Sequence, residues 1–287
     1  MAAKGRSKLT VCVPTRETAA TIEATVSALM SLTEIGLVDR ALVVDASSGD
    51  GTADLARSAG ADVLDEGDLI PEAGPVRGKG DAMWRALGEC DTDLICFVDG
   101  DVSDFAAHYV VGLVGPLLVD ERTAFSKGFF DRPLRLGEEE HPGEGGRVTE
   151  LMCRPLLEIL APELAEFRQP LAGEFAARTE LLERIPFATG YAVEAAMLID
   201  VWRLVGIEGM VEVGLGSKRN AHQSLRSLSR MAREVAEGIA RRLPDARASG
   251  SLVGSMEPAP GTEWLTVDRP PLQEAAEIGG VADGRAD

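Results

Sequence analysis

Short apolar segments alternate with stretches of helical periodicity over the first 120 residues, and this alternation strongly limits the possible folds. Segments 9–14, 41–45 and 94–98 have the length and the aliphatic content of buried strands. Between the first two, apolar residues recur at helical spacing from Ile22 to Met30. Each strand and its following helix occupy roughly 20 to 30 residues, which is typical of a parallel sheet with helices on both faces. We therefore predict an α/β fold.

The rest of the chain contains longer apolar stretches. Strands are expected over 123–130 and 211–215, and the Gly and Glu residues of 137–146 indicate a loop. From Pro244 onward Gly, Pro, Ser and Ala dominate, so this tail is expected either to fold against the body or to stay disordered. Helices are expected over 105–118, 148–160, 191–205 and 225–243.

The composition excludes several classes of partner. The chain has 29 Lys and Arg residues against 47 Asp and Glu, a formal net charge of −18, whereas proteins that bind nucleic acid or an anionic membrane present a basic face. No apolar run reaches the about 18 residues of a membrane-spanning helix, and no secretory signal is expected at the N-terminus. The four cysteines form no C-x-x-C pair, which favours buried thiols in a reducing cytoplasm.

Two carboxylates follow the strand at 94–98, in the sequence Asp99-Gly100-Asp101. Alternate residues of an extended segment point to the same side, so both acids can face one site, and Gly100 lets a ligand approach the backbone. Acids at the carboxyl end of a parallel strand suit a divalent cation that holds a diphosphate. Because Asp and Gly are also ordinary turn residues, a polar strand-to-loop turn is the alternative.

Three further polar segments, 14–17, 45–51 and 77–80, follow predicted strands or precede a predicted helix. Loops after the strand ends of an open α/β sheet share one crevice, and Gly78-Lys79-Gly80 at a helix N-terminus suits an anion. Taken alone, Lys79 is also consistent with a solvated surface lysine. Neither a Walker sequence nor G-x-G-x-x-G is present. The order of the segments points to a nucleotide-sugar site.

Eight short segments, colinear along the chain, carry a resemblance to a known family. They are Val13–Glu17, Gly78–Trp84, Phe97–Asp101, Val111–Leu118, Gly145–Leu151, Arg154–Leu157, Gln169–Glu174 and Gly190–Glu194. In these segments the chain resembles the retaining GT-A glycosyltransferases that make glucosyl-3-phosphoglycerate.

The resemblance implies a GT-A, Rossmann-like sheet that binds a nucleotide-sugar, with helices on both faces, and a smaller helical region that binds the acceptor. It divides the chain into a flexible arm (1–8), a nucleotide-sugar-binding region (9–135), an acceptor-binding and C-terminal helical region (136–243) and an extended or disordered tail (244–287).

The donor implied by the resemblance is a UDP-sugar, held together with Mg²⁺ or Mn²⁺. Asp101 is assigned to the ion, which bridges the UDP phosphates and stabilises the departing diphosphate as a Lewis acid. Leu171 and Gly173 belong to a turn that faces the donor glucose, and Glu174 in the same turn is a partner for sugar hydroxyls. The other donor contacts are assigned to residues near the strand ends: Pro14, Thr15, Glu17, Lys79, Asp99 and Gly100.

The acceptor implied by the resemblance is a small phosphorylated acid. Gly146, Arg147 and Thr149 are assigned to its phosphate, and Asn220 to its carboxylate. Physical reasoning supports the phosphate site, because glycine frees backbone N–H groups, arginine offers a fork of donors, and threonine adds a hydroxyl at a helix start. A glycine-rich loop followed by a helix cap is the alternative.

Glu194 precedes an apolar run, 195–199, where an unpaired buried carboxylate is unfavourable. We assign it to catalysis, where it positions the acceptor hydroxyl or contacts the sugar. An ion pair with an arginine inside the fold is the alternative. Two retaining routes remain open: a front-face route, in which the leaving diphosphate accepts the acceptor proton, and a double displacement.

One segment departs from the family pattern. The family supplies a metal-binding histidine in a His-Arg-Asn segment after the last core strand, and here the corresponding residues are Lys218-Arg219-Asn220. Either a local shift brings His222 to the metal, or Lys218 has replaced the ligand and the affinity for metal falls.

The main hypothesis is a hexosyltransferase that moves glucose from UDP-glucose to the 2-hydroxyl of 3-phosphoglycerate. A GDP-mannose donor, or another small acidic acceptor, is the close alternative. A nucleotidyltransferase is a different class, but segment 14–17 lacks the glycines of its loop, and a catalytically inactive binding protein is a third reading. The resemblance also suggests a homodimer, to which the predicted helix 225–243 could contribute.

Overall fold

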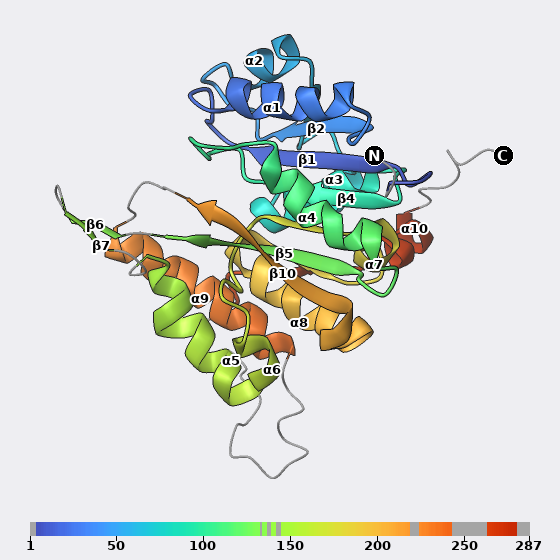
Figure 1. Ribbon diagram of the computed structural model, residues 1–287. Helices are drawn as coiled ribbons and strands as arrows, with labels where there is room; N and C mark the ends of the chain where they lie inside the picture. The colour runs from blue at the N-terminus through green and yellow to red at the C-terminus, as the bar shows by residue number, and fades with distance from the viewer. Residues whose placement is uncertain are drawn as a thin grey trace.

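The structure is a computed structural model that describes residues 4–132, 134–136, 139–141, 145–218, 224–242 and 263–279. At its centre is a seven-stranded sheet with the strand order β10-β5-β8-β4-β1-β2-β3 (Figure 1). The strands are β1 (Leu9–Thr15), β2 (Arg40–Asp45), β3 (Asp62–Asp65), β4 (Leu94–Phe97), β5 (Phe125–Asp131), β8 (Phe175–Arg178) and β10 (Met210–Ser217).

Strand direction brings the ends of several strands to one edge of the sheet. The β1–β2, β2–β3, β1–β4 and β5–β10 pairs are parallel, whereas β8 is antiparallel to both of its neighbours, β4 and β5. In the register of β1 and β2, Thr15 lies beside Asp45. The carboxyl ends of β1, β2 and β4 therefore meet, which is where open α/β sheets bind their ligands.

Successive residues of each central strand enter two different cores, because side chains alternate across a sheet. In β4, Cys96 packs into the core that also contains residues of α1 (Ile22–Glu34), α2 (Thr52–Ser58) and α4 (His108–Val119). Phe97, one residue later, packs into the opposite core. Both faces of the sheet are covered, as the alternation of apolar segments predicts.

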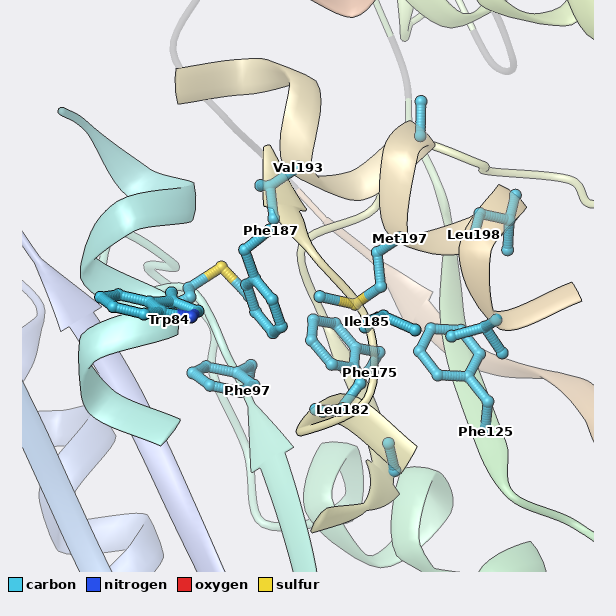
Figure 2. Close-up of a cluster of buried hydrophobic side chains, with 14 of the residues drawn as sticks. Trp84, Phe97, Phe125, Phe175, Leu182, Ile185, Phe187, Val193, Met197 and Leu198 are labelled. Carbon is cyan, nitrogen blue, oxygen red and sulfur yellow. The ribbon is translucent and has the colours of Figure 1, made fainter. Parts of the chain in front are cut away.

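The second core is rich in aromatic side chains and joins the sheet to the helices of the second half of the chain. Phe175 lies between Phe97 and Phe125, with ring centroids 5.2 and 5.3 Å away, and Met197 and Phe187 pack in the same cluster (Figure 2). The helices around this core include α3 (Lys79–Gly88), α5 (Arg154–Leu160), α6 (Pro162–Ala165), α7 (Thr179–Leu182), α8 (Val193–Val205) and α9 (Leu225–Arg242).

Short elements complete the described part of the chain. A π-helical turn, η2 (Thr149–Cys153), leads into α5. The 3₁₀ turns are η1 (Pro71–Ala73), η3 (Gly190–Ala192) and η4 (Ile207–Gly209), and two small sheets pair β6 (Leu134–Leu136) with β7 (Glu139–His141) and β9 (Phe187–Ala188) with β11 (Asp268–Arg269). No helix among the described residues is both long enough and apolar enough to cross a membrane.

The end of the described chain folds back onto the body. Residues 263–271, here called the C-terminal segment, include β11, which pairs antiparallel with β9, and α10 (Leu272–Gly279) follows. Glu237 of α9 accepts hydrogen bonds from the backbone N–H groups of Leu265 and Thr266, at 2.7 and 3.2 Å. Part of the predicted tail is thus ordered against α9 and β9.

The predicted α/β fold with a doubly covered sheet is confirmed. Strand β8 was not expected, and the segment expected as a loop over 137–146 contains β7 at Glu139–His141. The main sheet draws β8 and β10 from residues 136–243, so both predicted regions of the chain contribute strands to it. Lys4, in the expected flexible arm, forms an ion pair with Asp39 at 2.6 Å.

Candidate active site

The loops after β1, β2 and β4 are packed together at the edge where these strands end. Thr15 donates its hydroxyl to Asp45 Oδ1 at 2.9 Å. Gly100 follows β4, and a Cβ there would lie 2.7 Å from Thr15 Cγ2. Its carbonyl oxygen accepts a hydrogen bond from Thr21 Oγ1 at 2.6 Å. Gly100 is therefore needed for the close packing of two loops, a reason that the sequence pattern did not reveal.

A second set of contacts joins the loop after β1 to the loop after β2. Glu17 has a positive φ of 54°, and its backbone N–H donates to Ser48 Oγ at 2.8 Å. Ser48 in turn donates its hydroxyl to Asp45 Oδ1 at 2.8 Å. The Glu17 side chain is exposed, and Pro14 is half-buried in β1. The residues predicted to hold a uridine thus lie on one connected surface.

Five charged side chains form a continuous network beside these loops. Asp99 lies at its centre: its Oδ1 is 2.6 Å from Lys79 Nζ, and its Oδ2 is 2.7 Å from Lys218 Nζ. Lys79 Nζ also contacts Glu194 Oε1 at 3.0 Å, and Lys218 Nζ is hydrogen-bonded to Glu174 Oε1. We call Lys79, Asp99, Glu174, Glu194 and Lys218 the charge network. It joins four predicted site residues to Lys218, which pairs with two carboxylates.

Each member of the network is placed by the end of a regular element. Lys79 is the first residue of α3, and Glu194 is the second residue of α8. Asp99 follows β4 by two residues, and Glu174 directly precedes β8. Lys218 directly follows β10, where its backbone N–H donates to Asp131 O at 3.1 Å. The network therefore needs the sheet, α3 and α8 in their final positions.

Two glycines allow these elements to approach closely. A Cβ on Gly173 would overlap Lys79 Nζ and would lie 2.5 Å from Asp99 Oδ1. A Cβ on Gly80 would overlap the carbonyl oxygen of Ala188, in the segment that leads to α8. The absence of a side chain at Gly173 thus brings the Leu171–Glu174 turn onto the Lys79–Asp99 pair. Leu171, in the same turn, is half-buried.

The charges in the network determine which carboxyl group holds a proton most strongly. Burial opposes the ionisation of Asp99, but the ammonium groups of Lys218 and Lys79 outweigh it and hold the pKa of Asp99 well below its usual value. Burial and the neighbouring charge of Asp99 raise the pKa of Glu174, although Lys218 acts in the opposite direction. Of these two groups, Asp99 is therefore firmly ionised, and Glu174 takes up a proton before Asp99 as the pH falls.

The sequence analysis missed a buried lysine that contacts the Leu171–Glu174 turn. Lys127, in β5, is 1% exposed and donates from Nζ to Ala172 O at 2.8 Å. Burial lowers the pKa of its ammonium to about 8. The signal was present in the sequence, because Lys127 stands in a strand that is otherwise largely aromatic and apolar. Its hydrogen bond to Ala172 O helps to hold the Leu171–Glu174 turn in place.

The segment predicted to bind the acceptor phosphate is held at the end of β5. Gly145 N–H donates to Arg132 O at 2.9 Å, next to Asp131, which accepts from Lys218 N–H. Gly146 has a φ of 73°, and its carbonyl accepts from Glu150 N–H at 3.1 Å. Thr149 is buried at the start of η2, and Arg147 is half-buried. The structure therefore brings this loop and Lys218 to the same strand end.

The donor set suits a divalent cation that arrives with a diphosphate. Within the described residues, no group of three His, Cys, Asp or Glu side chains is arranged to hold a metal. Asp101 is exposed, and one or two carboxylates are the usual protein share of a Mg²⁺ site in which phosphates and water complete the shell. Asp101 therefore fits this role. The predicted ligand His222, and Asn220, lie outside the described residues.

Comparisons with known proteins place this chain in a family. Residues 10–121 match the model of "Glycosyl transferase family 2". A glucosyl-3-phosphoglycerate synthase from Mycolicibacterium smegmatis is 40% identical over 237 residues, which cover 82% of this chain and 77% of the relative. The chain belongs to the glucosyl-3-phosphoglycerate synthase family. The resemblance noted in the sequence is thereby confirmed.

Solved structures agree with the family over nearly the whole chain. The glucosyl-3-phosphoglycerate synthase of Mycobacterium tuberculosis, crystallised with Mn²⁺, UDP-glucose and phosphoglyceric acid, superposes with a TM-score of 0.81 at 37% identity, covering 96% of this chain and 93% of that one. The same enzyme has also been crystallised with Mg²⁺ and UDP. A mannosyl-3-phosphoglycerate synthase from Rubrobacter xylanophilus superposes with a TM-score of 0.84 at 39% identity, covering 95% and 92%.

Proposed function

We propose that this chain is a metal-assisted glycosyltransferase that moves glucose from UDP-glucose to the 2-hydroxyl of 3-phosphoglycerate, with retention of the anomeric configuration. The observation that carries the proposal is the charge network, which lies at the edge where β1, β2 and β4 end. The family membership and the ligands of the M. tuberculosis crystals support the same donor, acceptor and metal.

The donor roles follow from the positions of the residues. Pro14, Thr15 and Glu17 hold the uridine at the ends of β1 and β2, while Asp99 lies against the ribose. The ammonium of Lys79 offsets negative charge on the diphosphate, with Asp99 and Glu194 fixing its position at 2.6 and 3.0 Å. Asp101 ligates the divalent cation, which as a Lewis acid stabilises the departing UDP.

The sugar faces the Leu171–Glu174 turn. Because Gly173 has no side chain, this turn lies against the Lys79–Asp99 pair. Lys127 holds the turn in place by donating a hydrogen bond to the carbonyl of Ala172. Glu174 is a partner for sugar hydroxyls, with its other contact to Lys218. The acceptor is held by Gly146, Arg147 and Thr149 at its phosphate and by Asn220 at its carboxylate.

The ion pair of Glu194 favours the front-face route over a double displacement. Glu194 Oε1 lies 3.0 Å from Lys79 Nζ, so this carboxylate is already engaged in an ion pair and is not free to attack C1 of the sugar. In the front-face route the acceptor oxygen bonds to C1 of glucose while the bond from C1 to the β-phosphate oxygen breaks, and its electron pair leaves with UDP. The hydroxyl proton passes to an oxygen of the leaving diphosphate. Glu194 then positions Lys79 and the sugar.

We further propose a cytoplasmic homodimer. The four cysteines are buried free thiols, which suits a reducing compartment. Leu151, Ile159 and Leu225 are 79, 73 and 80% exposed, so apolar surface is available for a partner copy. Light scattering during gel filtration measures the mass directly, and a mass near the 30.4 kDa of one chain would contradict the dimer.

A mannose donor is the second candidate, and the similarity to the mannosyl-3-phosphoglycerate synthase favours testing it. The protein is incubated with Mn²⁺, 3-phosphoglycerate and a panel that contains UDP-glucose and GDP-mannose. We expect UDP release that depends on 3-phosphoglycerate, and a product whose anomeric proton matches the donor configuration by NMR. Release of GDP instead identifies the mannose donor, and release of pyrophosphate identifies a nucleotidyltransferase. Lack of turnover with every phosphorylated three-carbon acid would contradict the assignment of 3-phosphoglycerate as the acceptor.

A further inference from the structure

Lys218 occupies an unusual place for a lysine. Its side chain is 1% exposed, and its Nζ lies between Asp99 Oδ2, at 2.7 Å, and Glu174 Oε1. The ring centroid of Phe130 is 5.4 Å from the same nitrogen. The backbone of Lys218 is fixed by Asp131 at the end of β5. This ammonium is therefore held inside the protein, and its partners are two carboxylates from different strand ends.

Lys218 and Lys79 differ in their access to solvent, although both contact Asp99. The side chain of Lys79 is 25% exposed, whereas that of Lys218 is 1% exposed. Burial disfavours the charged form of Lys218, but Asp99 and Glu174 outweigh this effect and raise its pKa. The positive charge is thus a permanent part of the fold at neutral pH.

The balance of charges shows what this ammonium does. The network contains the two lysines Lys79 and Lys218 and the three carboxylates Asp99, Glu174 and Glu194. Without Lys218, Lys79 would be the one ammonium left in the network, beside the three carboxylates Asp99, Glu174 and Glu194. Neighbouring negative charges repel each other, and they also repel any diphosphate that approaches. A divalent cation would then be needed to offset both the phosphates and the protein.

We propose that Lys218 is a built-in counter-ion of the donor site, which offsets one of the negative charges of Asp99 and Glu174 so that a nucleoside diphosphate binds with a reduced requirement for a divalent cation. The inference rests on the proposed function, because it places the diphosphate beside the charge network. Asp101 keeps its role toward the cation, and Lys218 supplies charge that does not depend on it.

Calorimetry of UDP binding to the full chain tests the proposal without turnover. Titrations are run in Mn²⁺ and in EDTA for the unchanged protein, for Lys218→Arg, which keeps the charge, and for Lys218→Met, which removes it. Lys8→Met is the matched control, because Lys8 is exposed and precedes the opposite end of β1. Thermal unfolding of each variant is recorded in parallel.

The expected pattern separates the contribution of Lys218 from that of the metal. In EDTA the unchanged protein and Lys8→Met still bind UDP, and Lys218→Met binds at least about tenfold more weakly, as loss of a nearby unit charge predicts. Lys218→Arg stays within about threefold of the unchanged protein, because the charge is kept. In Mn²⁺ the deficit of Lys218→Met shrinks, because the cation offsets part of the lost charge.

The failures of the two proposals are distinguishable. If the unchanged protein binds UDP in Mn²⁺ and not in EDTA, the inference about Lys218 is overturned while the proposed function stands, and this result needs no variant to fold. Equal binding of Lys218→Met and the unchanged protein in EDTA overturns it as well. If UDP binds in neither condition, the proposed function fails.

Discussion

Arg269 and Asp81 form a bidentate ion pair across 188 residues of sequence. Nε of Arg269 donates to Oδ1 of Asp81 at 2.8 Å, and an Nη nitrogen donates to Oδ2 at 2.6 Å. Asp81 is fully buried in the first turn of α3 and also accepts from Arg85. Next to this pair, Trp84 Nε1 donates to Pro270 O at 2.8 Å. The C-terminal segment thus anchors the helix whose first residue is Lys79.

We expect Arg269→Ala to destabilise the protein by about 2 kcal/mol, because it removes one of the two arginines that donate to a buried carboxylate. Arg269→Lys recovers only part of this loss, since lysine cannot donate to both oxygens in the same geometry. Urea unfolding monitored by circular dichroism measures both changes. Arg122→Ala is the control: its ion pair with Asp120 is exposed, so no measurable change is expected. Equal midpoints for Arg269→Ala and the unchanged protein would contradict the anchoring role.

Gly173→Ala is expected to impair the site with little effect on the fold. The new Cβ would displace Lys79 or Asp99, so kcat/KM for the donor falls about 10- to 100-fold. Steady-state kinetics and thermal unfolding are measured together. Gly115→Ala in α4 is the matched control, because a Cβ there meets nothing within 4 Å; activity should be unchanged. Normal kinetics for Gly173→Ala would show that the Lys79–Asp99 pair tolerates a shift.

Asp101→Asn is expected to abolish measurable turnover while leaving the thermal unfolding midpoint unchanged. The side chain is exposed, so its charge contributes little to folding, whereas a neutral amide is a poorer ligand for Mg²⁺ or Mn²⁺. Binding of Mn²⁺ in the presence of UDP, followed by electron paramagnetic resonance, should weaken in parallel with activity. Retained activity together with retained Mn²⁺ binding would refute the assignment of Asp101 to the cation.

The buried ammonium of Lys127 should make stability depend on pH above neutrality. Burial lowers its pKa from 10.5 to about 8 in the folded protein. Between these pH values the unfolded chain binds more protons than the folded chain, so the free energy of unfolding rises with pH. The rise attributable to Lys127 is up to about 3 kcal/mol. Lys127→Met should lose this rise, which urea unfolding from pH 7 to 10 measures as a difference from the unchanged protein. Parallel pH profiles would contradict a depressed pKa.

Local sequence signals predicted most of the first half of the fold. Strands β1, β2 and β4 are rich in aliphatic residues, and the helices between them carry their own periodicity. Strand β8 has the sequence Phe-Ala-Ala-Arg, which lacks β-branched residues. It forms because β4 and β5 both present open edges to it, with Phe175 opposite Phe97. Such a strand depends on the strands beside it, and its own residues carry little signal for a strand.

The proximity of some predicted site residues also follows from the topology, whereas their individual contacts do not. Lys79 and Asp99 were found because strand ends and helix starts of an α/β sheet converge. The pairing of Lys218 with Asp99 and Glu174 depends on the register of β10 beside β5 and could not be read from spacing. The contact of Arg269 with Asp81 joins segments with no sequence relation at all. The topology thus predicted which polar residues lie near the strand ends, and it did not predict which residues they contact.

The position of Arg269 near the end of the chain has a consequence for the order of assembly. Translation proceeds from the N-terminus, so β1 to β4 and α3 leave the ribosome long before their anchor exists. The ion pair between Arg269 and Asp81 of that helix can form only after residue 269 has emerged. A polypeptide released prematurely, for instance at a stop codon within 243–262, would contain every strand of the main sheet and still lack the ion pair between Arg269 and Asp81 of α3.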